Sequence, residues 1–91
     1  MAKKRSKLEI VYNILENIRA RNGKIKPTHI LYKSNLSYQM MENYLDELKK
    51  NGLILELKMK GGKTYAITDK GLAYLDKYKL ITEFADTFGL G

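Results

Sequence analysis

The chain has 91 residues, of which 44% are hydrophobic and 30% are charged, and it carries a formal net charge of +7. This length accommodates one domain with a core and excludes a large enzyme architecture, while the composition excludes a disordered tail. Because the chain contains no cysteine, disulfide scaffolds, thiolate metal sites and cysteine nucleophiles are excluded as well.

The first predicted helix follows Ser6, because Ser6 and Glu9 have the S-x-x-E spacing of a capping box. Its apolar residues recur at helical spacing, which predicts one stripe that faces the core. This stripe consists of Leu8, Val11, Ile14, Leu15 and Ile18. Asn22 and Gly23 favour a left-handed helix end, and residues 24 to 26 are then expected to form a short extended segment.

Two further helices are expected before the spacing of the apolar residues changes. Pro27 suits the first turn of the second helix, which receives an apolar face from Ile30 and Leu31. Residues 34 to 36 predict a tight turn, and Ser37 is suited to cap the third helix. The apolar side of this third helix consists of Met41, Tyr44, Leu45 and Leu48. Residues 51 and 52, an Asn-Gly pair, predict its end.

From Leu53 the apolar period changes to two, which predicts a β-hairpin. The core-facing residues expected in its first strand are Leu53, Leu55, Leu57 and Met59. A three-residue loop at positions 60 to 62 would pair Leu57 with Tyr65 and Leu55 with Ile67, so that the apolar residues of both strands share one face. A two-residue loop of the paired glycines would not achieve this, and we therefore predict the longer loop.

The last predicted helix is capped by Thr68 and extends almost to Phe88. Leu72 and Leu75 are expected to pack on the domain. Apolar residues at alternating spacings of four and three then define a heptad seam, which predicts a homodimer formed through this helix. The seam consists of Tyr74, Tyr78, Ile81, Ala85 and Phe88. A helix that folds back over its own domain is the alternative.

The order of these elements resembles that of the winged helix-turn-helix superfamily. The run KTYAITDKGLAYL at residues 63 to 75 is similar to the Y-x-(I/L)-T-x-K-G-x-x-Y/L junction between wing strand and helix in its archaeal and bacterial members. The resemblance implies an α+β, mainly α fold, in which residues 1–70 form the winged helix-turn-helix DNA-binding domain and residues 71–91 a dimerisation helix continuous with it. The chain also resembles small archaeal winged-helix regulators that dimerise through a C-terminal coiled-coil helix.

The positive charge is concentrated in two segments. Residues 1 to 26 carry a net charge of +6 and residues 58 to 70 a net charge of +3, whereas the two remaining segments carry −1 each. Charge segregated in this way predicts a polyanionic partner, and with the implied fold we expect double-stranded DNA.

The start of the third helix is expected to contact bases and phosphates. Gln and Asn side chains can pair with adenine in the major groove, and a Glu can accept from cytosine. The residues assigned to this contact are Ser37, Tyr38, Gln39, Glu42 and Asn43. The carboxylates Glu42, Asp46 and Glu47 on the same helix favour the alternative of a protein partner.

Lysines of the hairpin and of the N-terminal segment are expected to contact the phosphate backbone. The hairpin lysines are Lys58, Lys60 and Lys63, and the basic arm before the first helix consists of Lys3, Lys4 and Arg5. This arm would alternatively be a solubilising end.

We therefore expect a homodimeric DNA-binding protein that acts as a transcriptional regulator or as a nucleoid-associated chromatin protein. The alternative is a winged-helix protein–protein interaction module without DNA binding. No motif in the sequence indicates catalysis, a cofactor or a metal site, and His29 is the only histidine. The sequence shows neither a signal peptide nor a membrane span, from which a cytoplasmic location is expected.

Overall fold

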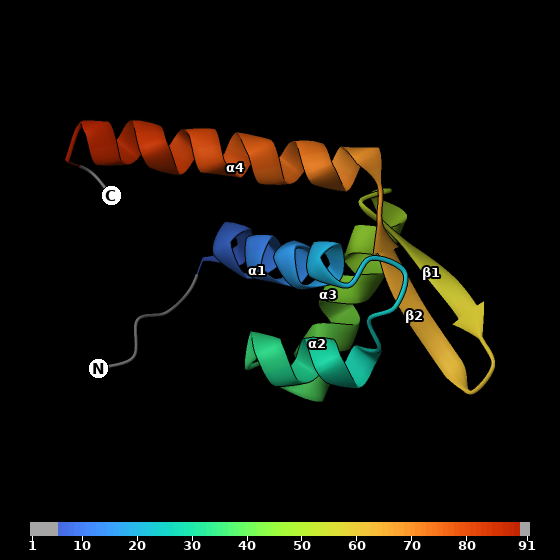
Figure 1. Cartoon of the computed structure of the whole chain (residues 1–91). Helices are drawn as coiled ribbons and strands as arrows, with labels where there is room; N and C mark the ends of the chain where they lie inside the picture. Colours follow the sequence, from blue (N-terminus) through green and yellow to red (C-terminus); the bar gives the residue numbers. More distant parts are fainter. Residues whose placement is uncertain (1–5, 90–91) are drawn as a thin grey trace.

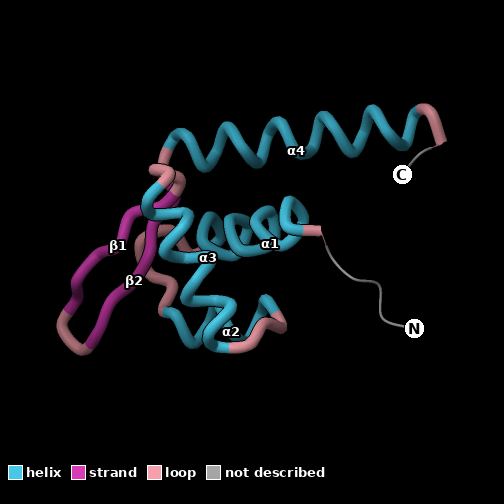
Figure 2. The backbone as a smooth tube through the Cα atoms, turned by 180° about the vertical axis from the view of Figure 1, so that it is seen from behind, coloured by secondary structure: helices cyan, strands magenta, loops and turns pink. Residues whose placement is uncertain are grey.

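The computed structural model describes residues 6–89, which form four helices and one antiparallel hairpin (Figure 1). The elements in chain order are α1 (Lys7–Ala20), α2 (Pro27–Ser34), α3 (Tyr38–Lys50), β1 (Ile54–Met59), β2 (Gly62–Ile67) and α4 (Asp69–Thr87). Helix α1 lies between α4 on one side and α2 with α3 on the other, and the hairpin projects from one end of this arrangement (Figures 1 and 2). The α+β, mainly helical architecture is confirmed. Among the described residues, no helix is long and apolar enough to cross a membrane.

Side-chain caps start three of the helices, as the sequence predicted. The Ser6 hydroxyl accepts from the amide of Glu9 at 3.2 Å, and the Ser37 hydroxyl accepts from the amide of Met40 at 3.2 Å. Thr68 likewise accepts from the amide of Gly71 at 3.1 Å. Each cap satisfies an amide that has no partner within its helix, which fixes where the helix begins.

The core is built around α1, which contributes five of its buried apolar side chains. The buried apolar residues of the described chain are Ile10, Val11, Ile14, Leu15, Ile18, Ile25, Ile30, Met41, Leu45, Leu48, Ile54, Tyr65 and Leu75. Two helical residues that were expected in the core are exposed instead. Leu8, in the first turn of α1, is 59% exposed. Leu72 is exposed because Gly71 and Leu75 occupy the inner face of α4.

The predicted hairpin register is wrong by one residue. Met59 pairs with Gly62, so the turn consists of two residues, and Gly61 adopts the left-handed φ of +93°. Tyr65 lies opposite Glu56, not opposite Leu57 as predicted. The cause is the core, because the side chain that fills it from β1 is Ile54.

The shifted register also changes which residues of β1 are exposed. Ile67 lies opposite Ile54 rather than Leu55, and Leu55 and Met59 are 56% and 52% exposed. Strand β2 lies between two neighbours, since its other edge forms an isolated bridge between Tyr65 and Ile25. Within the described chain β1 pairs with β2 alone and is the edge strand of the sheet.

Helix α4 contacts the domain through its first half. Leu75 is buried, as predicted, and the Tyr74 hydroxyl donates to the carbonyl of Leu8 at 2.8 Å. The rings of Tyr12 in α1 and Tyr78 in α4 are stacked with centroids 4.4 Å apart. Beyond Tyr78 the helix continues past the end of α1 (Figure 1). Its large apolar side chains there are exposed, namely Leu80, Ile81, Phe84 and Phe88.

Candidate nucleic-acid interface

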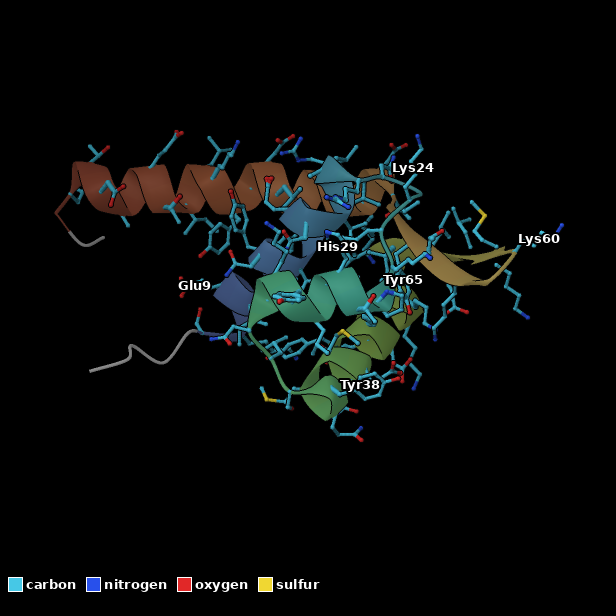
Figure 3. All side chains as sticks on the ribbon, turned by 60° about the horizontal axis from the view of Figure 1, so that its bottom comes forward. Glu9, Lys24, His29, Tyr38, Lys60 and Tyr65 are labelled. Atoms are coloured by element: carbon cyan, nitrogen blue, oxygen red, sulfur yellow. The ribbon has the colours of Figure 1, made fainter. Side chains whose placement is uncertain are left out.

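The start of α3 and the turn of the hairpin lie on the side of the domain that is remote from α4. Helix α3 begins at the end of the domain opposite α4, and the hairpin extends toward that same end (Figure 1). Figure 3 turns this side toward the viewer and shows Tyr38, at the start of α3, and Lys60, in the hairpin turn, on its outer margin. Polar groups from two distant parts of the sequence therefore share one side of the molecule.

The exposed amides at the start of α3 are arranged on one helix face. Gln39 and Asn43 are one turn apart, and the Gln39 Nε2 donates to the Asn43 Oδ1 at 3.1 Å. This bond leaves the Gln39 oxygen and the Asn43 amino group available for other partners, which is the acceptor and donor combination that pairs with adenine. Tyr38 beside them is 62% exposed. Ser37 uses its hydroxyl to cap the helix.

Two of the three carboxylates of α3 form ion pairs with lysines of the same chain. The Glu47 carboxylate lies 2.6 Å from the Lys7 ammonium at the start of α1, and this hydrogen bond raises the pKa of Lys7. Asp46 lies 3.6 Å from Lys49 one turn later. The negative charge that the sequence assigned to the outer face of α3 is therefore partly neutralised within the protein.

A second group of charges joins α3 to the hairpin. The Glu56 Oε1 in β1 lies 2.9 Å from the Lys49 Nζ in α3 and 3.6 Å from the Lys63 Nζ in β2. The hydrogen bond from Lys49 lowers the pKa of Glu56, and the same bond raises the pKa of Lys49. We call Lys49, Glu56 and Lys63 the hairpin cluster. Sequence reasoning missed it, because it depends on the register that places Glu56 opposite Tyr65.

The model of the winged helix-turn-helix family matches residues 4–86. The chain belongs to the winged helix-turn-helix family. In this family's terms α2 and α3 are the helix-turn-helix pair, α3 is the recognition helix and the hairpin is the wing.

A curated relative, an uncharacterized protein of Methanocaldococcus jannaschii, is 34% identical to the chain over 74 residues. The match covers 81% of this chain and 32% of the relative, so the chain spans about a third of the relative's length. The remainder of the relative, with any function that it carries, lies outside the matched segment.

Two solved structures illustrate the similarity of the winged-helix fold. Sso10a-2, a DNA-binding protein from Sulfolobus solfataricus, superposes with a TM-score of 0.79 at 26% identity, over 92% of this chain and 85% of that chain. A MarR family protein of Mycobacterium tuberculosis, in complex with p-aminosalicylic acid, superposes with a TM-score of 0.67 at 15% identity, over 86% of this chain and 60% of that chain. At that identity the second likeness shows the fold alone.

The remaining predicted site residues are distributed as follows. Lys58 and Lys60 project from the wing as exposed side chains, whereas Lys63 and Glu42 are half-buried. The predicted arm of Lys3, Lys4 and Arg5 lies outside the described residues. Among the described residues, no group of three or more histidines and carboxylates is placed to hold a metal ion.

Helix α2 carries an exposed aromatic that sequence reasoning missed. Tyr32 is 92% exposed, and His29, one turn earlier, is half-buried. The spacing of Ile30 and the buried Ser34 on the inner side of α2 is the signal that could have placed Tyr32 outside.

Proposed function

We propose that this winged-helix protein binds double-stranded DNA as a homodimer and acts as a transcriptional regulator or nucleoid-associated protein. The observation that carries the proposal is that the start of the recognition helix, at Tyr38, and the wing turn, at Lys60, lie on one side of the domain (Figure 3). A surface of this kind can contact bases and the phosphate backbone of one duplex together. The similarity to Sso10a-2, described as a DNA-binding protein, supports it.

The proposed contacts follow from the chemistry of each side chain. The start of α3 enters the major groove, where Gln39 and Asn43 read base edges. Lys58 and Lys60 of the wing contact phosphates, and Ser37 and Tyr38 approach the backbone beside the helix start. The N-terminal residues 3 to 5 supply further positive charge.

The uncovered half of α4 supports the homodimer. Four large apolar side chains lie exposed on one end of a single helix, and a surface of this kind marks an interaction site. Since Tyr74 and Tyr78 already pack on α1, the pairing surface shifts toward Ile81, Phe84 and Phe88. In this proposal residues 71–91 connect two DNA-binding domains of residues 1–70.

A gel shift with random duplex DNA at about 50 mM salt tests the proposal. We expect a complex at micromolar protein that dissociates as salt is raised. Absence of a complex would instead favour the protein-interaction module. The ion pairs of Asp46 and Glu47 reduce the negative charge that would attract a basic protein partner.

The base-reading contacts are tested by the double substitution of Gln39 and Asn43 with alanine. Selection of bound fragments from random DNA first identifies the preferred site. The variant is expected to lose about 1 to 3 kcal/mol of preference for that site per bidentate contact. Binding to random duplex should change little, and Lys77→Ala on the exposed surface of α4 serves as the control. Undiminished preference in the variant would remove the assigned base contacts.

A further inference from the structure

The lysines of the wing differ in what they contact. Within residues 6–89, Lys58 and Lys60 form no ion pair, and both side chains are exposed. Lys63 instead shares a single oxygen of Glu56 with Lys49. The three side chains of the hairpin cluster are 24% to 41% exposed, so they are partly shielded from water.

Lys63 is also surrounded by groups that favour its present position. Interaction with Tyr65, followed by that with Glu56, raises the pKa of Lys63, and Glu42 of the recognition helix adds to the increase. Tyr65 is buried and cannot follow a displaced lysine. A phosphate would therefore have to compete with the Glu56 carboxylate for this ammonium group.

We propose that Lys63 is a positioning residue of the wing and not a phosphate contact. From β2 it helps to hold the Glu56 carboxylate in place for the ion pair with Lys49 that connects the wing to the recognition helix, while Lys58 and Lys60 contact the DNA backbone. The claim that Lys63 positions the wing concerns the free protein. The claim that Lys63 makes no phosphate contact rests on the proposed DNA binding.

The salt dependence of DNA affinity tests the part about phosphates. Each lost phosphate contact makes the negative slope of log affinity against log salt shallower by about 0.9. We expect Lys60→Gln to reduce the slope by about this amount for each bound protomer, and Lys63→Gln to leave it unchanged. A reduction by Lys63→Gln as large as that by Lys60→Gln would overturn the proposal.

The order of the wing in the free protein tests the positioning part without DNA. Glu56→Gln should lower the NMR order parameters of the β1 and β2 amides, since it removes the charge that both lysines contact. Asp76→Asn, which removes a carboxylate from the exposed surface of α4, is the matched control and should change nothing in the wing. Lys63→Arg should retain the order of the wing. Order parameters in Glu56→Gln equal to those of the wild type would overturn the positioning role. If the wild type formed no complex with DNA, the proposed function would be refuted, but the NMR measurement would still test the positioning role.

Discussion

At the scale of single residues, Gly71 packs tightly against the base of the hairpin. A Cβ atom built there would collide with the backbone carbonyl of Leu53 and would lie 2.6 Å from the Ile67 Cγ1. A backbone carbonyl cannot rotate away as a side chain can. The residue is therefore required by the contact between α4 and the base of the wing.

We expect Gly71→Ala to lower the free energy of unfolding by about 1 to 3 kcal/mol, because overpacking outweighs the better helix propensity of alanine. Urea unfolding of the variant measures this. Lys77→Ala, at an exposed position of the same helix, should leave the midpoint almost unchanged. A Gly71→Ala midpoint equal to that of the wild type would show that α4 can shift at no cost.

The ion pair of Glu56 with Lys49 predicts that the free energy of unfolding depends on pH. The hydrogen bond from Lys49 lowers the pKa of Glu56 below its ordinary value of 4.5. The stabilisation is thus present above that ordinary value and is lost as the pH falls through the lower pKa of the folded state. Between about pH 6 and about pH 3 the wild type should lose more stability than Glu56→Gln. Parallel loss in both proteins, measured by urea unfolding, would contradict this.

At the scale of elements, the helices could be predicted because their signals are local. Ser6, Ser37 and Thr68 each mark a helix start through a hydrogen bond to a residue three positions later. The hairpin register could not be predicted in the same way. Its alternation of apolar residues favours the three-residue loop, whereas the observed register is supported by contacts of Ile25 and Asn22 with β2. Asn22 accepts from the amide of Ile67 at 2.8 Å across 45 residues of sequence.

The residues of the candidate site show the same difference between local signals and contacts of distant segments. The exposure of Gln39 and Asn43 follows from the buried stripe of α3, so sequence alone places them correctly on the outside. The partner of Lys63 does not follow, because Glu56 faces it only in the observed register. A lysine can be recognised in a sequence, but whether its charge is already compensated depends on contacts between distant segments.

The exposed apolar end of α4 allows a prediction of how a carboxylate introduced there would affect self-association. Phe84 is 66% exposed, and its ring lies 4.9 Å from that of Phe88. If two copies pair through this surface, Phe84→Glu should convert the dimer to a monomer, since it would bury two like charges at the interface. Sedimentation equilibrium measures the change. Lys79→Glu also introduces a carboxylate into α4 and is the control. A wild type that sediments as a monomer would refute the proposed pairing.

At the scale of the whole molecule, the proposed function predicts that pairing and DNA binding are coupled through the number of phosphates contacted. If each protomer neutralises about four phosphates, a dimer should show a slope of log affinity against log salt near −7. The monomeric Phe84→Glu variant should show about half of this slope. Fluorescence anisotropy over a range of salt concentrations measures both. An equal slope in the two proteins would mean that a single protomer makes all of the contacts.

The edge position of β1 has a consequence for the protein in concentrated solution. Its outer backbone groups are unpaired within the described chain, and Leu55 and Met59 present apolar surface beside them. Such a strand is a template for intermolecular sheet growth, and flanking lysines are the residues that ordinarily prevent it. Lys58 and Lys60 would therefore act as gatekeepers against aggregation as well, and replacing both with small apolar residues should favour fibrous or amorphous precipitates.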